Sequence, residues 1–196
     1  QPALLWAGSG QVIMPKKATH QDVLAFWFTE TQPQSWFKKD PAFDAEIDRR
    51  FGSTVKDALA GRCDDWASHK DGCLALILLL DQFTRNIFRD TARAFSGDDM
   101  ALALSLRCVE RDYINHPDAH WRHFMLMPMM HSEDLAVQDA SLPLFKAHTV
   151  KLTYDYAVAH RDIIARFGRF PHRNAILGRP STDDETLFLT QPGSSF

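Results

Sequence analysis

Residues 73–80 read CLALILLL and are followed directly by DQFTRNIFR at residues 81–89. The first eight residues contain no polar side chain, a pattern that fits either a central helix or a buried strand. The sequence has no second run of this kind that could pair with it as a strand. The stretch therefore predicts a helix in the middle of a hydrophobic core, and with it an all-α fold.

Local start and stop signals agree with helices along most of the chain. Thr19 and Asp40 carry side chains that commonly cap a helix start, and Gly168 can end a helix in the left-handed conformation. Thr182 and Glu185 form the capping-box pattern of a last short helix. Together with the apolar spacing, these signals predict about eight to nine helices, packed as antiparallel pairs. The longer helices are expected over residues 20–29, 41–60, 71–80, 98–113, 119–130, 133–148 and 150–167.

Composition limits the class of protein. The chain has 196 residues, of which 45% are hydrophobic and 24% charged, and its net charge is −3. This balance suits one packed domain and gives no electrostatic reason to expect nucleic acid as a partner. The longest apolar run is far below the ~20 residues that cross a bilayer, so we expect no membrane span. Three cysteines without a CxxC motif argue against a disulfide framework or a zinc site and favour a reducing, cytoplasmic setting.

The beginning of the chain has the character of an addition to the domain. Residues 1–12 carry no basic residue ahead of their short apolar stretch, which is atypical of a signal peptide. The GSG at residues 8–10 resembles a flexible linker, and Met14 opens a stretch typical of a natural protein start. We therefore expect an N-terminal extension over residues 1–18 that is not part of the core fold. A single all-helical domain is expected over residues 19–196.

The first polar segment follows the apolar run directly. Asp81 and Arg85 are four residues apart and can pair on one helix face, while Gln82 and Asn86 share the adjacent face. This pattern is typical of a helix that leaves the core with a solvated ion pair. It fits equally well the polar wall of a pocket, with Asp81 as an acid–base group and Gln82, Arg85 and Asn86 as ligand-binding side chains.

Two histidines stand in apolar surroundings. His131 follows a methionine-rich stretch in which Pro128 should kink the helix, and Ser132 and Glu133 come next. Ser132 can cap the following helix while Glu133 and Asp134 complement its dipole, or His131 and Glu133 can converge at a break between helices as acid–base groups. His160 lies within a stripe of apolar residues at helical spacing, so it is either a core residue with a hydrogen-bond partner or a further acid–base candidate.

The last polar segment is basic and irregular. Arg166, Arg169 and Arg173 present planar donors suited to carboxylates or phosphates, with His172 and Asn174 beside them. These side chains can bind an anion, with His172 as an acid–base group, or can serve as counter-charges inside the fold. No P-loop, GxGxxG or HExxH motif accompanies them, and the histidines lack ligand spacing, so we expect no cofactor and no metal.

Several stretches together resemble the uncharacterised bacterial family called domain of unknown function 924. They are FWF at 26–28, LDQFTRNIFR at 80–89, MMHSE at 129–133, IARFGRFPHRN at 164–174 and the ending at 181–196. The resemblance covers about residues 20–196, and Thr84 stands where the usual form has proline. It implies an all-helical fold like the right-handed tetratricopeptide-repeat superhelix, without regular repeat sequences. It carries no established activity.

Two classes of function fit this pattern. The leading hypothesis is a binding or scaffold module whose polar segments line a groove for a peptide or a small anionic ligand. The alternative is an enzyme, a hydrolase or transferase, that acts on a phosphorylated or carboxylated small molecule. An enzyme requires Asp81, His131 and Arg173 to converge on one pocket, whereas a scaffold can spread them along a groove or pair them internally.

Overall fold

The protein is all-α. The structure, a computed structural model, describes residues 17–196, and no strand occurs among them. Nearly all of the expected N-terminal extension lies outside the described residues. At its end, Lys17 Nζ lies 2.5 Å from the Asp57 carboxylate, and Ala18 packs against the main hydrophobic core.

The described residues form nine α-helices joined by short π- and 3₁₀-helical segments. The α-helices are α1 (His20–Ala25), α2 (Pro41–Leu59), α3 (Lys70–Ile77), α4 (Thr84–Ile87), α5 (Asp98–Glu110), α6 (Ala119–Met130), α7 (Leu135–His148), α8 (Lys151–Phe167) and α9 (Asp183–Leu189). The other segments are η1 (Phe26–Glu30), η2 (Pro33–Ser35), η3 (Asp64–Ser68), η4 (Leu78–Phe83), η5 (Ala92–Phe95) and η6 (Pro171–Arg173).

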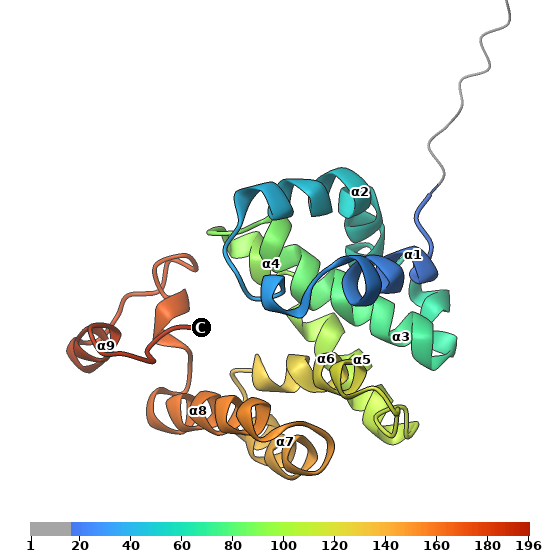
Figure 1. Ribbon diagram of the computed structural model, residues 1–196. Helices are drawn as coiled ribbons and strands as arrows, with labels where there is room; N and C mark the ends of the chain where they lie inside the picture. The colour runs from blue at the N-terminus through green and yellow to red at the C-terminus, as the bar shows by residue number, and fades with distance from the viewer. Residues whose placement is uncertain (1–16) are drawn as a thin grey trace, which may run out of the picture.

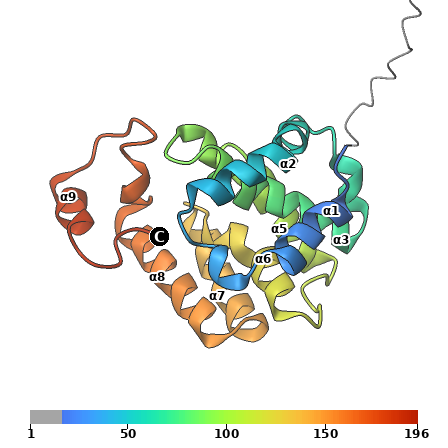
Figure 2. The same ribbon diagram turned by 45° about the horizontal axis from the view of Figure 1, so that its top comes forward.

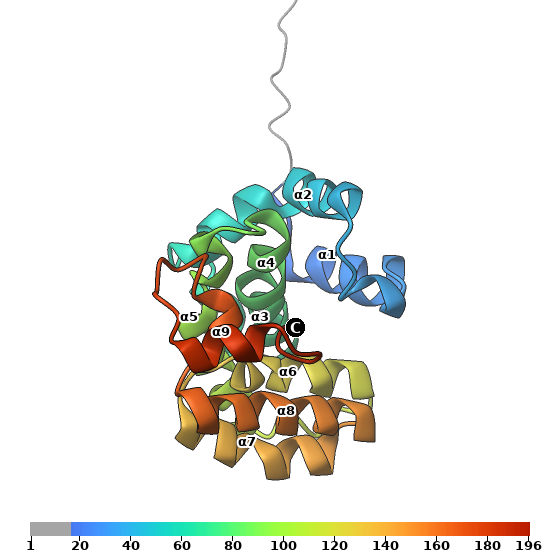
Figure 3. The ribbon, with the colours of Figure 1, turned by 90° about the vertical axis from the view of Figure 1, so that its left-hand side faces the viewer.

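The helices follow one another through the molecule in chain order. In Figures 1 and 3, α1 and α2 lie at one end, α3 to α6 in the middle, and α7 with α8 at the other end. The pairs α5–α6, α6–α7 and α7–α8 are in contact, and the short link between α7 and α8 makes that pair antiparallel. Figure 2 shows α9 and its loops on one side of this stack. The right-handed superhelical winding stays a prediction.

The expected helix caps are present where the sequence predicts them. Thr19 and Thr182 each form a reciprocal capping box, and the Asp40 carboxylate accepts the backbone N–H groups of residues 42 and 43. Gly168 ends α8 with φ of 71°, in the left-handed region. The expectation that Ser132 caps α7 is wrong. The cap is Asp134, whose carboxylate accepts the N–H of residue 136.

The apolar run forms the centre of one long helix, Lys70–Ile87, as predicted. Every residue from Cys73 to Leu80 is buried, so this helix is surrounded by the core. A π-helical segment, η4, interrupts it at Leu78–Phe83 and contains Asp81 and Gln82. Single π turns inside α-helices widen the helix locally and are frequent at functional sites. Local apolar spacing carries no signal for such a turn, and the sequence did not predict it.

Gly97 brings the start of α5 against the central helix. A Cβ atom at Gly97 would clash with the backbone carbonyl of Leu80, so only glycine permits this approach. Because Asp98 follows directly, its carboxylate is held beside the η4 segment. The sequence predicts a helix start at residue 98 but not this contact.

The apolar stripe of α8 is buried only in part. Ile163 and Ile164 are buried, whereas Leu152 and Tyr156 are exposed although they continue the same stripe. The first half of α8 therefore presents apolar side chains outside the core. Across residues 17–196, none of the helices has the length and apolar character that a bilayer crossing requires.

Candidate functional site

A cavity of about 750 Å³ opens between the central helix, α6, α8 and the C-terminal segment. Its walls combine charged groups, four histidines and large apolar side chains. Its residues are Trp36, Phe37, Gln82, Arg85, Asn86, Arg89, Asp90, Ala94, Phe95, His123, Met127, Met130, His131, Leu152, Thr153, Tyr156, His160, His172, Arg173, Ile176, Ser195 and Phe196. Figures 1 and 3 show how the chain returns after α9, so that its last residues lie beside α8.

His131 is held by a buried carboxylate. Its Nδ1 lies 2.7 Å from Oδ1 of Asp81, which is fully buried and also accepts a 2.7 Å hydrogen bond from the Gln82 amide. Although burial alone would raise it, the pKa of Asp81 is held well below its usual range by its interactions with His131 and Arg85 and by the hydrogen bond from Gln82. Because an ionised carboxylate only accepts, Nδ1 carries the proton and Nε2 is left with a lone pair.

The Nε2 atom of His131 has no hydrogen-bond partner among residues 17–196. The side chain lines the cavity, so this lone pair is available to a bound molecule. Burial lowers the pKa of His131, and it outweighs the opposite effect of the Asp81 carboxylate. The imidazole is therefore neutral near pH 7 and can accept a proton.

The other cavity histidines are also neutral near pH 7, because they too are buried. Burial lowers the pKa of His160 to about 3, and of His123 and His172 to about 4. The Nδ1 of His160 donates to the Tyr156 carbonyl at 2.7 Å, so its Nε2 also bears a lone pair. Within the described part of the chain, no three histidine, cysteine or carboxylate side chains converge as metal ligands.

Two of the cavity arginines have a dedicated carboxylate. Arg85 binds Asp98 through two bonds of 2.6 and 3.0 Å, and Arg89 binds Asp44 through two bonds of 2.6 and 2.8 Å. The predicted partner of Arg85, the Asp81 carboxylate, lies 3.5 Å away and is therefore the weaker contact. Both guanidinium charges are balanced within the protein.

Arg173 is the cavity arginine whose charge is incompletely balanced. It donates to the His131 carbonyl at 3.0 Å, and its distance to Asp98, which already binds Arg85, is 3.7 Å. Its guanidinium lies over the rings of Phe95 and Phe170, with the guanidinium carbon 4.6 Å from each ring centre. Its Nε is buried without an acceptor among residues 17–196, and burial lowers the pKa of Arg173 to about 10. An anion in the cavity would stabilise this charge.

The remaining predicted residues meet elsewhere, around α9. Glu133 accepts two bonds from Arg179 and one from the Phe170 backbone N–H. Glu185 binds Arg169 through two bonds of 2.7 and 2.8 Å. We call this group the α9 cluster; its members are Glu133, Arg169, Asn174, Arg179 and Glu185. Nearby, Arg166 pairs with Asp184 on the surface.

The structure thus divides the predicted site residues into two groups. Around the cavity it brings together Asp81, Gln82, Arg85, Asn86, His131, His160, His172 and Arg173. It places Glu133, Arg169 and Asn174 in the α9 cluster and Arg166 in an exposed ion pair. We call the charged group at one end of the cavity the cavity cluster; its members are Asp81, Arg85, Asp98, His131 and Arg173.

Several residues of the site were not predicted from the sequence. Asp98 binds Arg85 beside the cavity, and Arg179 binds Glu133 in the α9 cluster. Trp36, Phe37 and His123 come from segments that carry no chemical motif. Their only signal was the concentration of aromatic residues, which also fits ordinary core packing.

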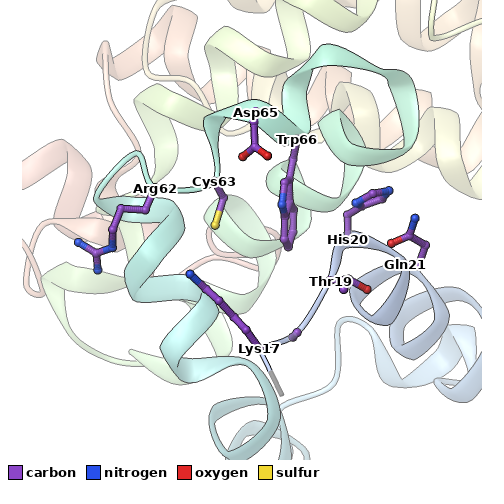
Figure 4. Close-up of a pocket in the computed structure, with 9 residues that line it drawn as sticks. Lys17, Thr19, His20, Gln21, Arg62, Cys63, Asp65 and Trp66 are labelled. Atoms are coloured by element: carbon purple, nitrogen blue, oxygen red, sulfur yellow. The ribbon is translucent and has the colours of Figure 1, made fainter. Parts of the chain in front are cut away.

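A second hollow of about 420 Å³ lies at the start of α1, between residues 17–21 and residues 62–66. Its two basic side chains are already paired, because Lys17 and Arg62 both bind Asp57. Figure 4 shows the Arg62 side chain turned away from the rings of Trp66 and His20. The larger cavity, which is lined by four histidines and an incompletely paired arginine, is therefore the better candidate site.

Comparison with known proteins agrees with this fold. A family model described as a bacterial protein of unknown function, DUF924, matches residues 23–193. A solved structure of a protein of unknown function from Agrobacterium tumefaciens is 38% identical, with a TM-score of 0.82, and the match covers 87% of this chain and 96% of that chain. Among curated proteins, none matches. The matched range includes the cavity cluster and the α9 cluster, and the chain belongs to the DUF924 family.

Proposed function

We propose that this protein is an enzyme in which His131 acts as a general base on a small anionic substrate. The observation that carries the proposal is the Asp81–His131 pair, which leaves an unused lone pair on Nε2 of a neutral imidazole that lines the cavity. Asp81 is a positioning residue, since it fixes the tautomer and orientation of His131 without lining the cavity. Arg173 anchors the negative charge of the substrate.

Hydrolysis is the reaction that this arrangement supports with the fewest additional groups. His131 Nε2 takes a proton from water as the water oxygen bonds to the carbonyl or phosphoryl centre of the substrate. The negative charge that develops on the substrate oxygen is stabilised by Arg173, which binds the His131 backbone and lies next to the base. The proton then passes from His131 to the leaving group, whose bond to the central atom breaks.

The arrangement favours an enzyme over a scaffold module. The groups converge on one cavity of about 750 Å³, a size typical of small-molecule sites, instead of spreading along an open groove. A module that binds peptides has no need for a buried carboxylate behind a histidine.

A cytoplasmic setting is part of the proposal. It is supported by the three free, buried cysteines, of which Cys73 and Cys108 place their Sγ atoms 3.5 Å apart. Free thiols in such contact are typical of reducing compartments.

The test is hydrolysis of a panel of para-nitrophenyl phosphates and para-nitrophenyl esters of dicarboxylic acids. We expect turnover of at least one compound and a loss on the order of 100-fold or more in His131→Gln. The matched control is Arg166→Gln, which removes an exposed arginine outside the cavity and should leave the rate unchanged. Equal rates for the wild-type protein and His131→Gln across the panel would refute the proposal.

A further inference from the structure

The cavity has a second, apolar half that the proposed chemistry does not use. Resting on the proposed function, we infer that the substrate is an amphiphile, with an anionic head at Arg173 and a hydrocarbon tail of medium length. The tail lies along α8 and leaves through an exposed apolar rim. We define this rim by its residues, Phe37, Leu152, Tyr156 and Phe196.

The two ends of the cavity differ in chemistry. At the head end, the guanidinium groups of Arg85 and Arg173 lie over the ring of Phe95, and Arg173 also binds the His131 carbonyl. At the other end, the polar side chains of His123 and Thr153 bond to each other at 3.0 Å. The remaining ring nitrogen of His123 is buried and has no partner among residues 17–196. A polar tail would find few hydrogen-bond partners there, whereas a hydrocarbon tail needs none.

Helix α8 sets the distance between the two ends. Thr153, Tyr156 and His160 all line the cavity and lie on one helix face, at spacings of three and four residues. The axial rise from Thr153 to His160 is roughly 10 Å. His160 is near the head end, since its ring centre lies 6.3 Å from that of His131. Phe37 is at the far end, with its ring centre 5.8 Å from that of His123. A tail of medium length therefore spans the apolar half.

The rim exposes large apolar side chains at the place where such a tail would emerge. The exposed fractions are 63% for Phe37, 64% for Leu152, and 51% for both Tyr156 and Phe196. Exposed apolar side chains that gather around a cavity mark a binding surface, in contrast to single ones scattered over the molecule. Their contact with a hydrocarbon tail removes apolar area from water and so favours binding.

Phe196 joins the rim to the catalytic end. Its ring stacks on His160 with centres 3.7 Å apart, and it also contacts the ring of Tyr156. His160 is therefore shielded by an apolar ring on the side that faces the rim. A tail that runs past this ring meets apolar surface from the head end to the opening.

The test measures binding of simple anions to the full chain by isothermal titration calorimetry. The probes are butanoate, octanoate and octylammonium, the last of which keeps the tail and reverses the charge. We expect octanoate to bind at least about tenfold more tightly than butanoate, because each buried methylene contributes on the order of fourfold. Octylammonium should bind at least tenfold more weakly than octanoate, since Arg173 repels it.

Two variants locate the tail. Leu152→Ser should weaken octanoate about three- to tenfold and leave butanoate unchanged. Leu187→Ser is the matched control, because Leu187 lies on α9 outside the cavity with a similar exposed fraction of 61%. It should change neither affinity. Equal affinity for butanoate and octanoate, or equal weakening by both variants, would overturn the inference.

The outcomes separate this inference from the proposed function. Octanoate selectivity that depends on Leu152, without His131-dependent hydrolysis, would support the amphiphile site and contradict the enzyme. His131-dependent hydrolysis without any preference for octanoate over butanoate would support the proposed enzyme and contradict the inference that its substrate has a hydrocarbon tail.

Discussion

The cavity cluster and the α9 cluster both combine carboxylates with arginines, and both take residues from the segments 131–133 and 169–174, yet their hydrogen-bonding groups are satisfied to different degrees. In the α9 cluster, Glu133 and Glu185 each bind an arginine through two bonds, and backbone N–H groups occupy further oxygen lone pairs. In the cavity cluster, Arg173 keeps an unused donor and His131 an unused lone pair. Arg169 is internally paired and Arg173 lines the cavity, although the two are only four positions apart in the sequence.

This difference shows that the state of the hydrogen-bonding groups, and not the residue type, separates structural from functional positions. A bidentate pair between an arginine and a carboxylate satisfies both partners and stabilises the fold. A group left unsatisfied costs stability and persists where a ligand completes it. Substitutions in the α9 cluster should therefore affect stability alone, and those in the cavity cluster mainly activity.

The largest effect is expected for Asp81→Asn. The amide no longer fixes the Nδ1–H tautomer of His131, so kcat for the proposed hydrolysis should fall about 10³- to 10⁴-fold, with a much smaller change in KM. Loss of the carboxylate charge should also lower the pKa of His131, which shifts the alkaline-rising limb of the pH–rate profile to lower pH. If the pH–rate profile does not shift, and kcat falls only to the extent that the variant protein unfolds, Asp81 has a merely structural role.

The next largest effect is expected in the α9 cluster. Glu133→Ala removes the partner of Arg179 and of the Phe170 N–H, and should lower the free energy of unfolding by about 3 kcal/mol. At a temperature where the variant is folded, kcat should remain within twofold of the wild-type value. Urea unfolding tests the expected loss of stability, and steady-state kinetics on the same preparation test the expected retention of kcat. A large fall in kcat for the folded variant would contradict the separation of the two clusters.

The pH dependence of stability separates the cavity histidines from the α9 cluster without mutation. The folded-state pKa values of His160 and His172, about 3 and about 4, lie below the unfolded value of 6.5. The unfolded chain therefore takes up protons that the folded chain does not. The two histidines therefore make their full contribution to the free energy of unfolding above pH 6.5. As the pH falls from 6.5 toward 4, the free energy of unfolding decreases by about 1.4 kcal/mol per pH unit for each histidine.

The contribution of the α9 cluster to stability should change only at lower pH. The pKa of Glu185 is lowered to about 2 by its hydrogen bonds from Arg169, so its contribution is lost only below its ordinary value of 4.5. Unfolding measured between pH 7 and pH 5 therefore reports on the cavity histidines alone. In His160→Gln the slope in this window should be smaller, and an unchanged slope would contradict the low pKa of His160.

The smallest effect is expected for Arg166→Ala. Its pair with Asp184 is exposed on both sides and should contribute less than about 0.5 kcal/mol to stability. A loss above 1 kcal/mol in thermal unfolding would place Arg166 within the α9 cluster.

Much of the fold follows from local chemistry and could be predicted. Thr19, Asp40, Gly168 and Thr182 act within a few residues of themselves, so their caps appear where the sequence indicates. The convergence of Asp81, His131 and Arg173 could be proposed only as one of two alternatives, since it depends on contacts between distant segments.

Other features had no local signal. Arg85 prefers Asp98 to Asp81 because Gly97 allows α5 to approach the central helix, and this approach is a tertiary property. Glu133 turns away from His131 because Arg179, 46 residues later, is placed beside it by the fold. Spacing along one helix predicts neither contact.

The central claim is that an anion held at Arg173 meets the free Nε2 of His131, and alkylation by bromoacetate tests it most directly. The carboxylate binds Arg173, Nε2 attacks the methylene carbon, and bromide leaves. Peptide mapping should find the carboxymethyl group on His131 at least about tenfold faster than on the exposed His69, with octanoate slowing the reaction. Modification of His131 no faster than that of His69, with or without octanoate, would contradict the account.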